Sequence, residues 1–380
     1  MLKKSALSLA VLVSGTAYAS GSVQDSAMQC TLMEDKSLRL ACFDTIYAAQ
    51  YPPTQPIKLS EEATKAIDLV KTFDRIKEQG SSGVLVFDSA DAIINGVEAT
   101  PTLKEAAEAY TPLSTQYDLD KNDDRGIFSI RVHEPMYLLP AWYNASPNNS
   151  METPSRDLVK LNAGDQKHLE TKMQVSFKSK LMENVFKTRA DLWFGYTQVS
   201  HWQLYNQKNS APFRNTDYMP ELFLTQPVKA NLPGGGRLRM LGVGVVHQSN
   251  GRTEPLSRSW NRIYGMAGME WGKLTVIPRV WVRAFEDKNK DDNPDVSDYM
   301  GHGDLKLQYR FSDKRTLGSS IRYNPKSGKG GVQVDYTFPV VGKMKGYVQG
   351  FHGYGQNMLD YNHKHNSVGI GVMFNDWDGF

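Results

Sequence analysis

From about Gly126 onward, apolar and polar side chains alternate with a period of two. In the segment 304–311, for example, Leu305 and Leu307 alternate with Lys306 and Gln308. The clearest cases are the segments 274–285, 304–311, 332–338 and 368–374. This period is typical of β-strands whose two faces meet different surroundings. We therefore predict an all-β domain over residues 126–380.

Two all-β folds fit this alternation, a soluble sandwich and a closed membrane barrel. Charges of both signs recur on the polar faces, for instance Asp304 and Arg310, which suits a lumen that pairs them. Aromatic side chains border the apolar faces, as in the interfacial girdles of membrane barrels. These are Trp281, Tyr336, Phe338, Tyr347 and Phe374. The alternation alone leaves both folds open.

The first 20 residues, MLKKSALSLAVLVSGTAYAS, indicate export. A positive start, a short apolar core and an Ala-Tyr-Ala site predict a signal peptide over residues 1–19. The apolar run is shorter than the ~20 residues of a spanning helix, which argues against a membrane anchor. An exported chain without such a helix can cross a membrane only as a closed barrel.

Residues 20–125 have a different character and are expected to form an N-terminal extension. Ser60 to Gly80 read as a capped amphipathic helix, which is a packing element. Cys30 and Cys42 are expected to form a disulfide in an oxidising compartment. The net charge of +3 implies no nucleic-acid partner.

The segment 241–250, LGVGVVHQSN, contains the candidate chemistry. Its apolar face continues into His247 and Ser249, and a hairpin with residues 257–264 would bring Asn261 beside His247. Histidine can take the proton of a serine nucleophile, and an amide can fix the imidazole tautomer. The alternative is that these are ordinary polar residues at a barrel rim.

Two acidic segments, 118–126 and 286–295, have carboxylates at partial EF-hand spacing. Both lack the glycine at the sixth position and the terminal glutamate of that motif. We interpret both as solvated loops.

The stretch HQSNGRTEPLSRSWNRIY, residues 247–264, resembles the signature of the outer membrane phospholipase A family. The resemblance covers about residues 126–380 and continues in the family's order. The further matching segments are 195–206, 210–223, 291–295, 299–310 and 368–376.

This resemblance implies a 12-stranded antiparallel transmembrane β-barrel with a small mixed N-terminal extension in the periplasm. Ser249 would be the nucleophile, His247 the general base and Asn261 its orienting residue. The backbone amide of Gly251 would donate to the oxyanion. The implied activity is hydrolysis of acyl esters in phospholipids and lysophospholipids of the bacterial outer membrane.

The resemblance also implies a calcium ion and a homodimer. Calcium would be bound by the carbonyl of Arg252, the hydroxyl of Ser257 and the carbonyl of Ser210 from a second copy. Gln198 would be buried in the dimer.

The chain departs from some family members at Glu254 and Ala211, which leaves a second calcium site open. The alternatives are a non-enzymatic outer-membrane pore or structural barrel, and a soluble periplasmic esterase.

Overall fold

The computed structural model describes residues 93–94, 97–98, 111–121, 125–287, 291–312, 314–341 and 344–375. The predicted signal peptide, the pairing of Cys30 with Cys42, the helix at residues 60–80 and the C-terminal Phe380 lie outside these residues. Two short strands, β1 (Ile93–Ile94) and β2 (Val97–Glu98), pair with each other. None of the described helices is long and apolar enough to cross a membrane.

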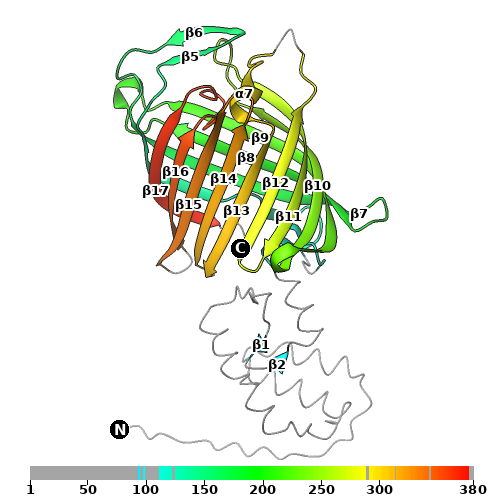
Figure 1. The fold of residues 1–380 in the computed structure, drawn as a ribbon. Helices are drawn as coiled ribbons and strands as arrows, with labels where there is room; N and C mark the ends of the chain where they lie inside the picture. The colour runs from blue at the N-terminus through cyan, green and yellow to red at the C-terminus, as the bar shows by residue number, and fades with distance from the viewer. Residues whose placement is uncertain are drawn as a thin grey trace, which may run out of the picture. The chain divides into compact units, whose positions relative to one another are not determined.

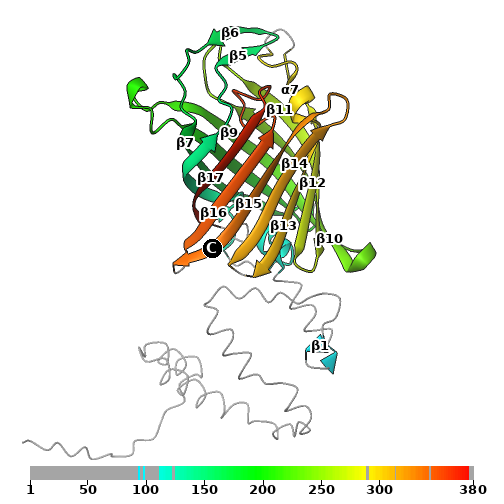
Figure 2. The same ribbon diagram turned by 60° about the vertical axis from the view of Figure 1, so that its left-hand side comes forward.

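The described part of the chain is dominated by one closed antiparallel barrel (Figures 1 and 2). Its strands are β4 (Met136–Asn144), β7 (Leu169–Val185), β8 (Ala190–Trp202), β9 (Phe213–Leu232), β10 (Gly236–Ser249), β11 (Ser259–Trp271), β12 (Leu274–Arg283), β13 (Gly303–Ser312), β14 (Arg315–Asn324), β15 (Lys329–Val341), β16 (Met344–Gly353) and β17 (His365–Asn375). Each pairs with the next, and β17 pairs with β4 to close the ring. The predicted 12-stranded barrel is thus confirmed.

A short strand, β3 (Ile130–Val132), pairs with β7 beside β4, so β3 and β4 share one position in the ring. A separate hairpin, β5 (Ser150–Thr153) and β6 (Arg156–Lys160), lies in the connection between β4 and β7.

The two ends of the barrel differ in their connections. Short turns join the strands at one end, including the turn Pro233–Gly235 between β9 and β10. The other end, called here the long-loop end, has the connections 145–168, 203–212, 250–258, 284–302 and 354–364. The connection 203–212 is bounded by Trp202, the last residue of β8, and by Phe213, the first residue of β9.

The strand faces follow the predicted alternation. In β12, Val280 and Val282 are exposed on the outside, whereas Ile277 and Trp281 are buried inside. Trp281 and Tyr347 therefore do not belong to the outer aromatic border, which was a wrong prediction. The Asp304 carboxylate pairs with Arg279 on the neighbouring strand, at 2.5 Å and 3.0 Å, so opposite charges pair inside the barrel.

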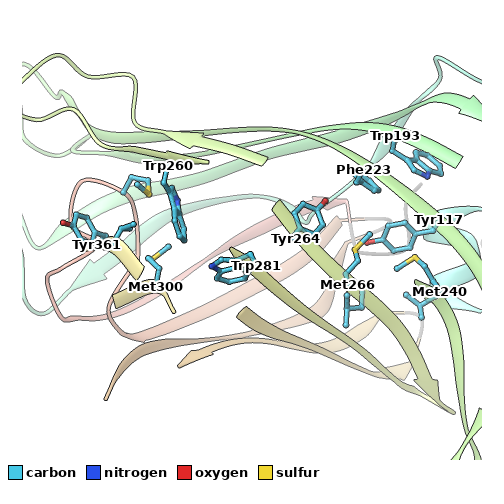
Figure 3. Packing of buried hydrophobic residues seen from close by; sticks show 14 of the residues in the cluster. Tyr117, Trp193, Phe223, Met240, Trp260, Tyr264, Met266, Trp281, Met300 and Tyr361 are labelled. Carbon is cyan, nitrogen blue, oxygen red and sulfur yellow. The ribbon is translucent and has the colours of Figure 1, made fainter. Parts of the chain in front are cut away.

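Large side chains fill much of the barrel interior. Many of them form one hydrophobic cluster, and Figure 3 shows Tyr117, Trp193, Phe223 and Met240 near one end of it. Tyr117 belongs to the short helix α6 (Pro112–Tyr117), which Thr111 caps and whose Leu113 amide donates to Glu270 of β11. A second cluster comprises Tyr137, Leu139, Trp142, Tyr347, Phe351 and Met373. Between these groups lies a cavity of about 200 Å³, which is lined by charged, polar and apolar side chains.

Candidate active site

The outer face of β10 is apolar until it approaches the long-loop end. Leu241, Val243 and Val245 are 47%, 51% and 41% exposed, and the exposed His247 continues their row. Gln248 points the opposite way and is buried inside the barrel. His247 therefore emerges on the outer wall.

The pairing of β10 with β11 places Asn261 directly opposite His247. The Nδ1 atom of His247 lies 2.8 Å from the Oδ1 atom of Asn261 in a hydrogen bond. Ser249 occupies the next outward position and pairs with Ser259. Among the described contacts there is no hydrogen bond between Ser249 and His247, so the structure joins two of the three side chains and places the third on the same face.

Gln248 anchors this strand pair from the inside. Its Oε1 accepts hydrogen bonds from Trp260 Nε1 at 3.0 Å and from Arg262 Nη2 at 2.9 Å. Its Nε2 donates to Asp217 of β9 at 3.2 Å. A register shift of one residue would break these buried bonds and turn His247 inward, so they help to specify the outer position of the site.

The loop 250–258 is closed by Asn250. Its Oδ1 accepts from the amide of Arg258 at 3.0 Å, and its Nδ2 donates to the carbonyl of Leu256 at 2.8 Å. Gly251 has a φ of +60°, and a Cβ atom there would lie 2.9 Å from the Tyr218 ring. Both the backbone conformation and the close ring favour glycine at this position.

Arg252 and Ser257 are each fixed by contacts at the ends of this loop. The Arg252 Nη2 atom donates to the carbonyls of Phe213 and Arg214, at 2.9 Å and 2.6 Å. The Ser257 hydroxyl donates to Asp292 Oδ2 at 2.5 Å. The contacts of Arg252 also bring this loop beside the start of β9.

Asp292 and Arg156 were missed as site residues by the sequence reasoning. Asp292 lies in the segment 286–295, and it is buried, as is Asn293. Arg156, from the hairpin β5–β6, contacts both Asp292 and the exposed Glu254. Only the family-like DDNPD stretch signalled Asp292, and no sequence signal marked Arg156.

The interpretation of both acidic segments as solvated loops was wrong in part, because each segment contains a buried aspartate, Asp118 and Asp292, although Asp287 is exposed. In the other segment, 118–126, Asp118 is buried and forms an ion pair with Lys180. Asp120 of the same segment pairs with Arg239 at 2.7 Å.

Ser210 and Gln198 lie on or beside the same wall. Ser210 is exposed in the loop 203–212 and has a φ of +59°. Gln198, half-buried on β8, accepts from Tyr196 Oη at 2.9 Å and donates to Ser200 Oγ at 3.3 Å. Both ends of its carboxamide therefore have partners within one copy of the chain.

Comparison with known proteins identifies the family. The family described as Phospholipase A1 matches residues 113–374, about two thirds of the chain. The chain belongs to the phospholipase A1 family.

Relatives and solved structures agree with this family. A putative phospholipase A1 of Neisseria meningitidis is 56% identical over 372 residues, which cover 97% of this chain and 96% of that protein. The Escherichia coli K12 phospholipase A1 is 39% identical over 54% of this chain and 70% of its own length. A Salmonella typhi outer membrane phospholipase, solved as a dimer with bound calcium, has a TM-score of 0.62 and 33% identity, covering 70% of this chain and 99% of that one.

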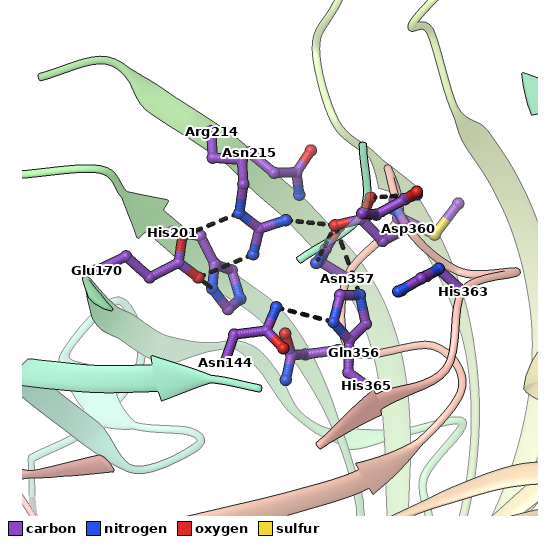
Figure 4. Close-up of polar contacts among 12 residues, drawn as sticks. Asn144, Glu170, His201, Arg214, Asn215, Gln356, Asn357, Asp360, His363 and His365 are labelled. Atoms are coloured by element: carbon purple, nitrogen blue, oxygen red, sulfur yellow. Dashed lines mark hydrogen bonds and ion pairs between the residues drawn. The ribbon is translucent and has the colours of Figure 1, made fainter. Parts of the chain in front are cut away.

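Behind the wall that carries His247, this phospholipase A1 barrel has a buried polar network at its long-loop end (Figure 4). Arg214 binds Glu170 through Nε at 2.9 Å and Nη2 at 2.8 Å, and it also pairs with Asp360. Burial raises the pKa of Asp360, but the opposing effect of Arg214, followed by that of His365, is larger. The net result is a pKa of Asp360 below the usual range. Met358, in the same loop as Asp360, donates its amide to Asp217, which connects the network to Gln248.

A second outward pair resembles the first. His352 of β16 faces Asn366 of β17, and their Nδ1 and Oδ1 atoms are 2.5 Å apart. This pair lies six strands from β10–β11 in the ring of twelve, on the opposite side of the barrel. Two residues after His352 stands Tyr354, where the first site has Ser249. The second pair therefore lacks a nucleophile and offers a matched control.

Proposed function

We propose that this phospholipase A1 family member is an outer-membrane serine hydrolase that cleaves acyl ester bonds of phospholipids and lysophospholipids. The observation that carries the proposal is the His247–Asn261 hydrogen bond on the outer wall, with Ser249 next on the same face. An apolar wall below these groups suits a substrate that stays in the bilayer.

In this mechanism Ser249 attacks the ester carbonyl while His247 takes its proton. Because Nδ1 of His247 is bonded to Asn261, Nε2 is the nitrogen left to exchange protons with the hydroxyl. The same nitrogen then returns the proton to the leaving alcohol. Water attacks the acyl-enzyme in a second, similar cycle and regenerates Ser249.

The backbone amide of Gly251 is proposed to donate a hydrogen bond to the oxyanion. The positive φ of Gly251 and the clamp formed by Asn250 support this role, because they hold the amide in a fixed loop two residues after Ser249. A preorganised donor of this kind commonly contributes a large part of catalysis.

The donors around the loop fit calcium, a hard cation that prefers oxygen. The proposed ligands are the Arg252 carbonyl, the Ser257 hydroxyl and the Ser210 carbonyl of a second copy. When bound there, calcium would supply positive charge beside the ester carbonyl oxygen. No cluster of three or more acidic, histidine or cysteine side chains suited to a metal occurs in the described part of the chain, so the proposed site depends on carbonyl and hydroxyl oxygens.

Dimerisation is proposed to activate the enzyme, because one copy alone lacks the Ser210 ligand. The exposed position of Ser210 and the calcium-bound dimer of the Salmonella typhi relative support this step. Gln198, on the outer face of β8, would lie in the dimer interface.

The barrel and its apolar outer face support an outer-membrane location, with residues 20–125 proposed to lie in the periplasm. The alternative of an open pore is disfavoured by the filled interior and its cavity of about 200 Å³. A soluble esterase would not expose the apolar row Leu241–Val243–Val245.

The test uses purified full-length protein, phospholipid in mixed detergent micelles, and calcium or a chelator. We expect fatty acid release with calcium, and loss of release in Ser249→Ala and with the chelator. The matched control His352→Ala should keep full activity. Release by Ser249→Ala at the wild-type rate would reject the proposed nucleophile.

A further inference from the structure

The hairpin β5–β6 contacts Asp291 and Asp292, and the Asp292 side chain in turn accepts a hydrogen bond from the Ser257 hydroxyl. Thr153 Oγ1 donates to the carbonyl of Asp292 at 2.7 Å, and Ser155 Oγ donates to the carbonyl of Asp291 at 2.6 Å. These two bonds fix the backbone on both sides of the peptide that carries the Asp292 side chain.

Arg156 of the same hairpin holds that side chain directly. Its Nε and Nη2 atoms both donate to Asp292 Oδ1, at 2.9 Å and 2.5 Å. Nη2 also lies 2.8 Å from Glu254 Oε1. Since the Glu254 side chain is 69% exposed and that of Asp292 is 10% exposed, the contact with Asp292 is the stronger constraint.

Asp292 divides its two oxygens between two partners. Oδ1 is occupied by Arg156, which leaves Oδ2 to accept the hydroxyl hydrogen of Ser257 at 2.5 Å. A hydroxyl that donates in one fixed direction has its lone pairs aimed in another fixed direction. Arg156 thus acts on the orientation of the Ser257 oxygen through one intervening carboxylate.

We infer that Arg156 is a positioning residue of the active-site loop, and that the hairpin β5–β6 orients the Ser257 hydroxyl toward the metal. This inference rests on the proposed function, since it takes Ser257 as a calcium ligand. Arg156 contacts neither substrate nor metal in this scheme.

The charge of Arg156 and its proposed positioning role predict opposite changes in calcium affinity when Arg156 is replaced. Removing a cation near a calcium site would by electrostatics alone strengthen calcium binding. Losing the orientation of Asp292 and Ser257 would weaken it, as changes in outer-shell partners of metal ligands commonly do. The direction of the change in affinity therefore separates the two accounts.

The experiment compares Arg156→Gln, Arg156→Lys and the control Lys160→Gln, which alters an exposed residue of the same strand. Calcium affinity is measured by titration calorimetry on the detergent-solubilised full chain. Hydrogen exchange of residues 250–259 is measured on the metal-free protein. The Ser259 amide, which donates to Asn293 at 2.9 Å, reports on the contact between this loop and the Asp292 segment.

For Arg156→Gln we expect calcium binding about tenfold weaker and exchange of the Ser259 region about tenfold faster. Arg156→Lys keeps the charge but cannot donate from two nitrogens to Asp292 in the same geometry. Its calcium affinity and exchange rate should therefore fall between those of wild type and Arg156→Gln. Lys160→Gln should match wild type.

Equal or tighter calcium binding by Arg156→Gln would overturn the inference, and so would unchanged exchange in the Ser259 region. If wild-type protein neither binds calcium nor releases fatty acid, the proposed function fails. In that case faster exchange in Arg156→Gln would still support the hairpin's role in holding the loop.

Discussion

Replacing Asn261 by alanine isolates the group that orients His247. Only the side chain is lost, because the Asn261 backbone amide still donates to Glu286 and its carbonyl still accepts from the amide of Ala284. The strand pairing with β10 does not depend on the carboxamide. We therefore expect Asn261→Ala to fold and to keep its calcium dependence.

The size of the effect follows from the charge that His247 acquires during the reaction. A hydrogen bond between neutral groups contributes about 0.5–1.5 kcal/mol, and one to a charged group contributes about 1.5–3 kcal/mol. The bond to Asn261 therefore strengthens by about 1–2 kcal/mol as the imidazole takes the Ser249 proton. Its loss should lower kcat by about 5–30-fold, with KM nearly unchanged because the carboxamide does not contact the substrate.

The assay is the initial rate of fatty acid release from phospholipid micelles at saturating calcium. Asn366→Ala, which removes the same carboxamide from the His352 pair on the opposite side, is the matched control and should have the wild-type rate. A decrease of less than twofold for Asn261→Ala, or an equal decrease for both variants, would show that the Asn261 carboxamide does not assist His247 in catalysis.

Contacts of Gln248, Asp360 and Ser257 lead to three further expected outcomes. Gln248→Leu leaves Trp260 Nε1 and Arg262 Nη2 without their acceptor, so the free energy of unfolding in detergent should fall by about 2–6 kcal/mol; an unchanged unfolding midpoint would contradict this. Because the pKa of Asp360 is lowered in the fold, its charge stabilises the barrel above a pH of about 4 and this contribution is lost as the pH falls through the folded-state pKa. The melting temperatures of wild type and Asp360→Asn should therefore differ at pH 7 and converge in acid, and a difference independent of pH would count against it. Ser257→Ala should raise the calcium concentration for half-maximal hydrolysis by about 10–100-fold, and an unchanged calcium curve would remove Ser257 from the proposed ligands.

Much of the barrel was predictable because a strand with one lipid-facing side has a strict period of two. This period separates Val280 and Val282, which are exposed on the outside, from Ile277, which is buried inside. The predicted aromatic border was wrong at Trp281 because this residue was assigned to the border by its side-chain type and not by the face of the strand that it occupies. Trp281 lies on the inward face of β12. Ion-pair partners were not predictable, since Asp304 selects Arg279 across the sheet and strand register comes only with the fold.

His247 and Asn261 could be predicted from the sequence because their side chains suit catalysis and also fall on the same face of two paired strands. The supports of the site were not visible, because they come from distant loops. Arg156 lies 136 residues before Asp292 in the chain, and no local pattern connects them. The acidic segment 286–295 was misinterpreted for the same reason: an Asp-rich stretch looks solvated until the partners that bury it are known.

Covalent labelling of the full-length protein tests directly whether Ser249 is the nucleophile. An alkyl sulfonyl fluoride, which reacts with activated serines, is added in calcium-containing micelles, and the modified residue is identified by mass spectrometry. We expect one adduct, on Ser249, that persists in His352→Ala and is lost in His247→Ala. An adduct on a different serine, or continued lipid hydrolysis after Ser249 is fully labelled, would contradict this assignment.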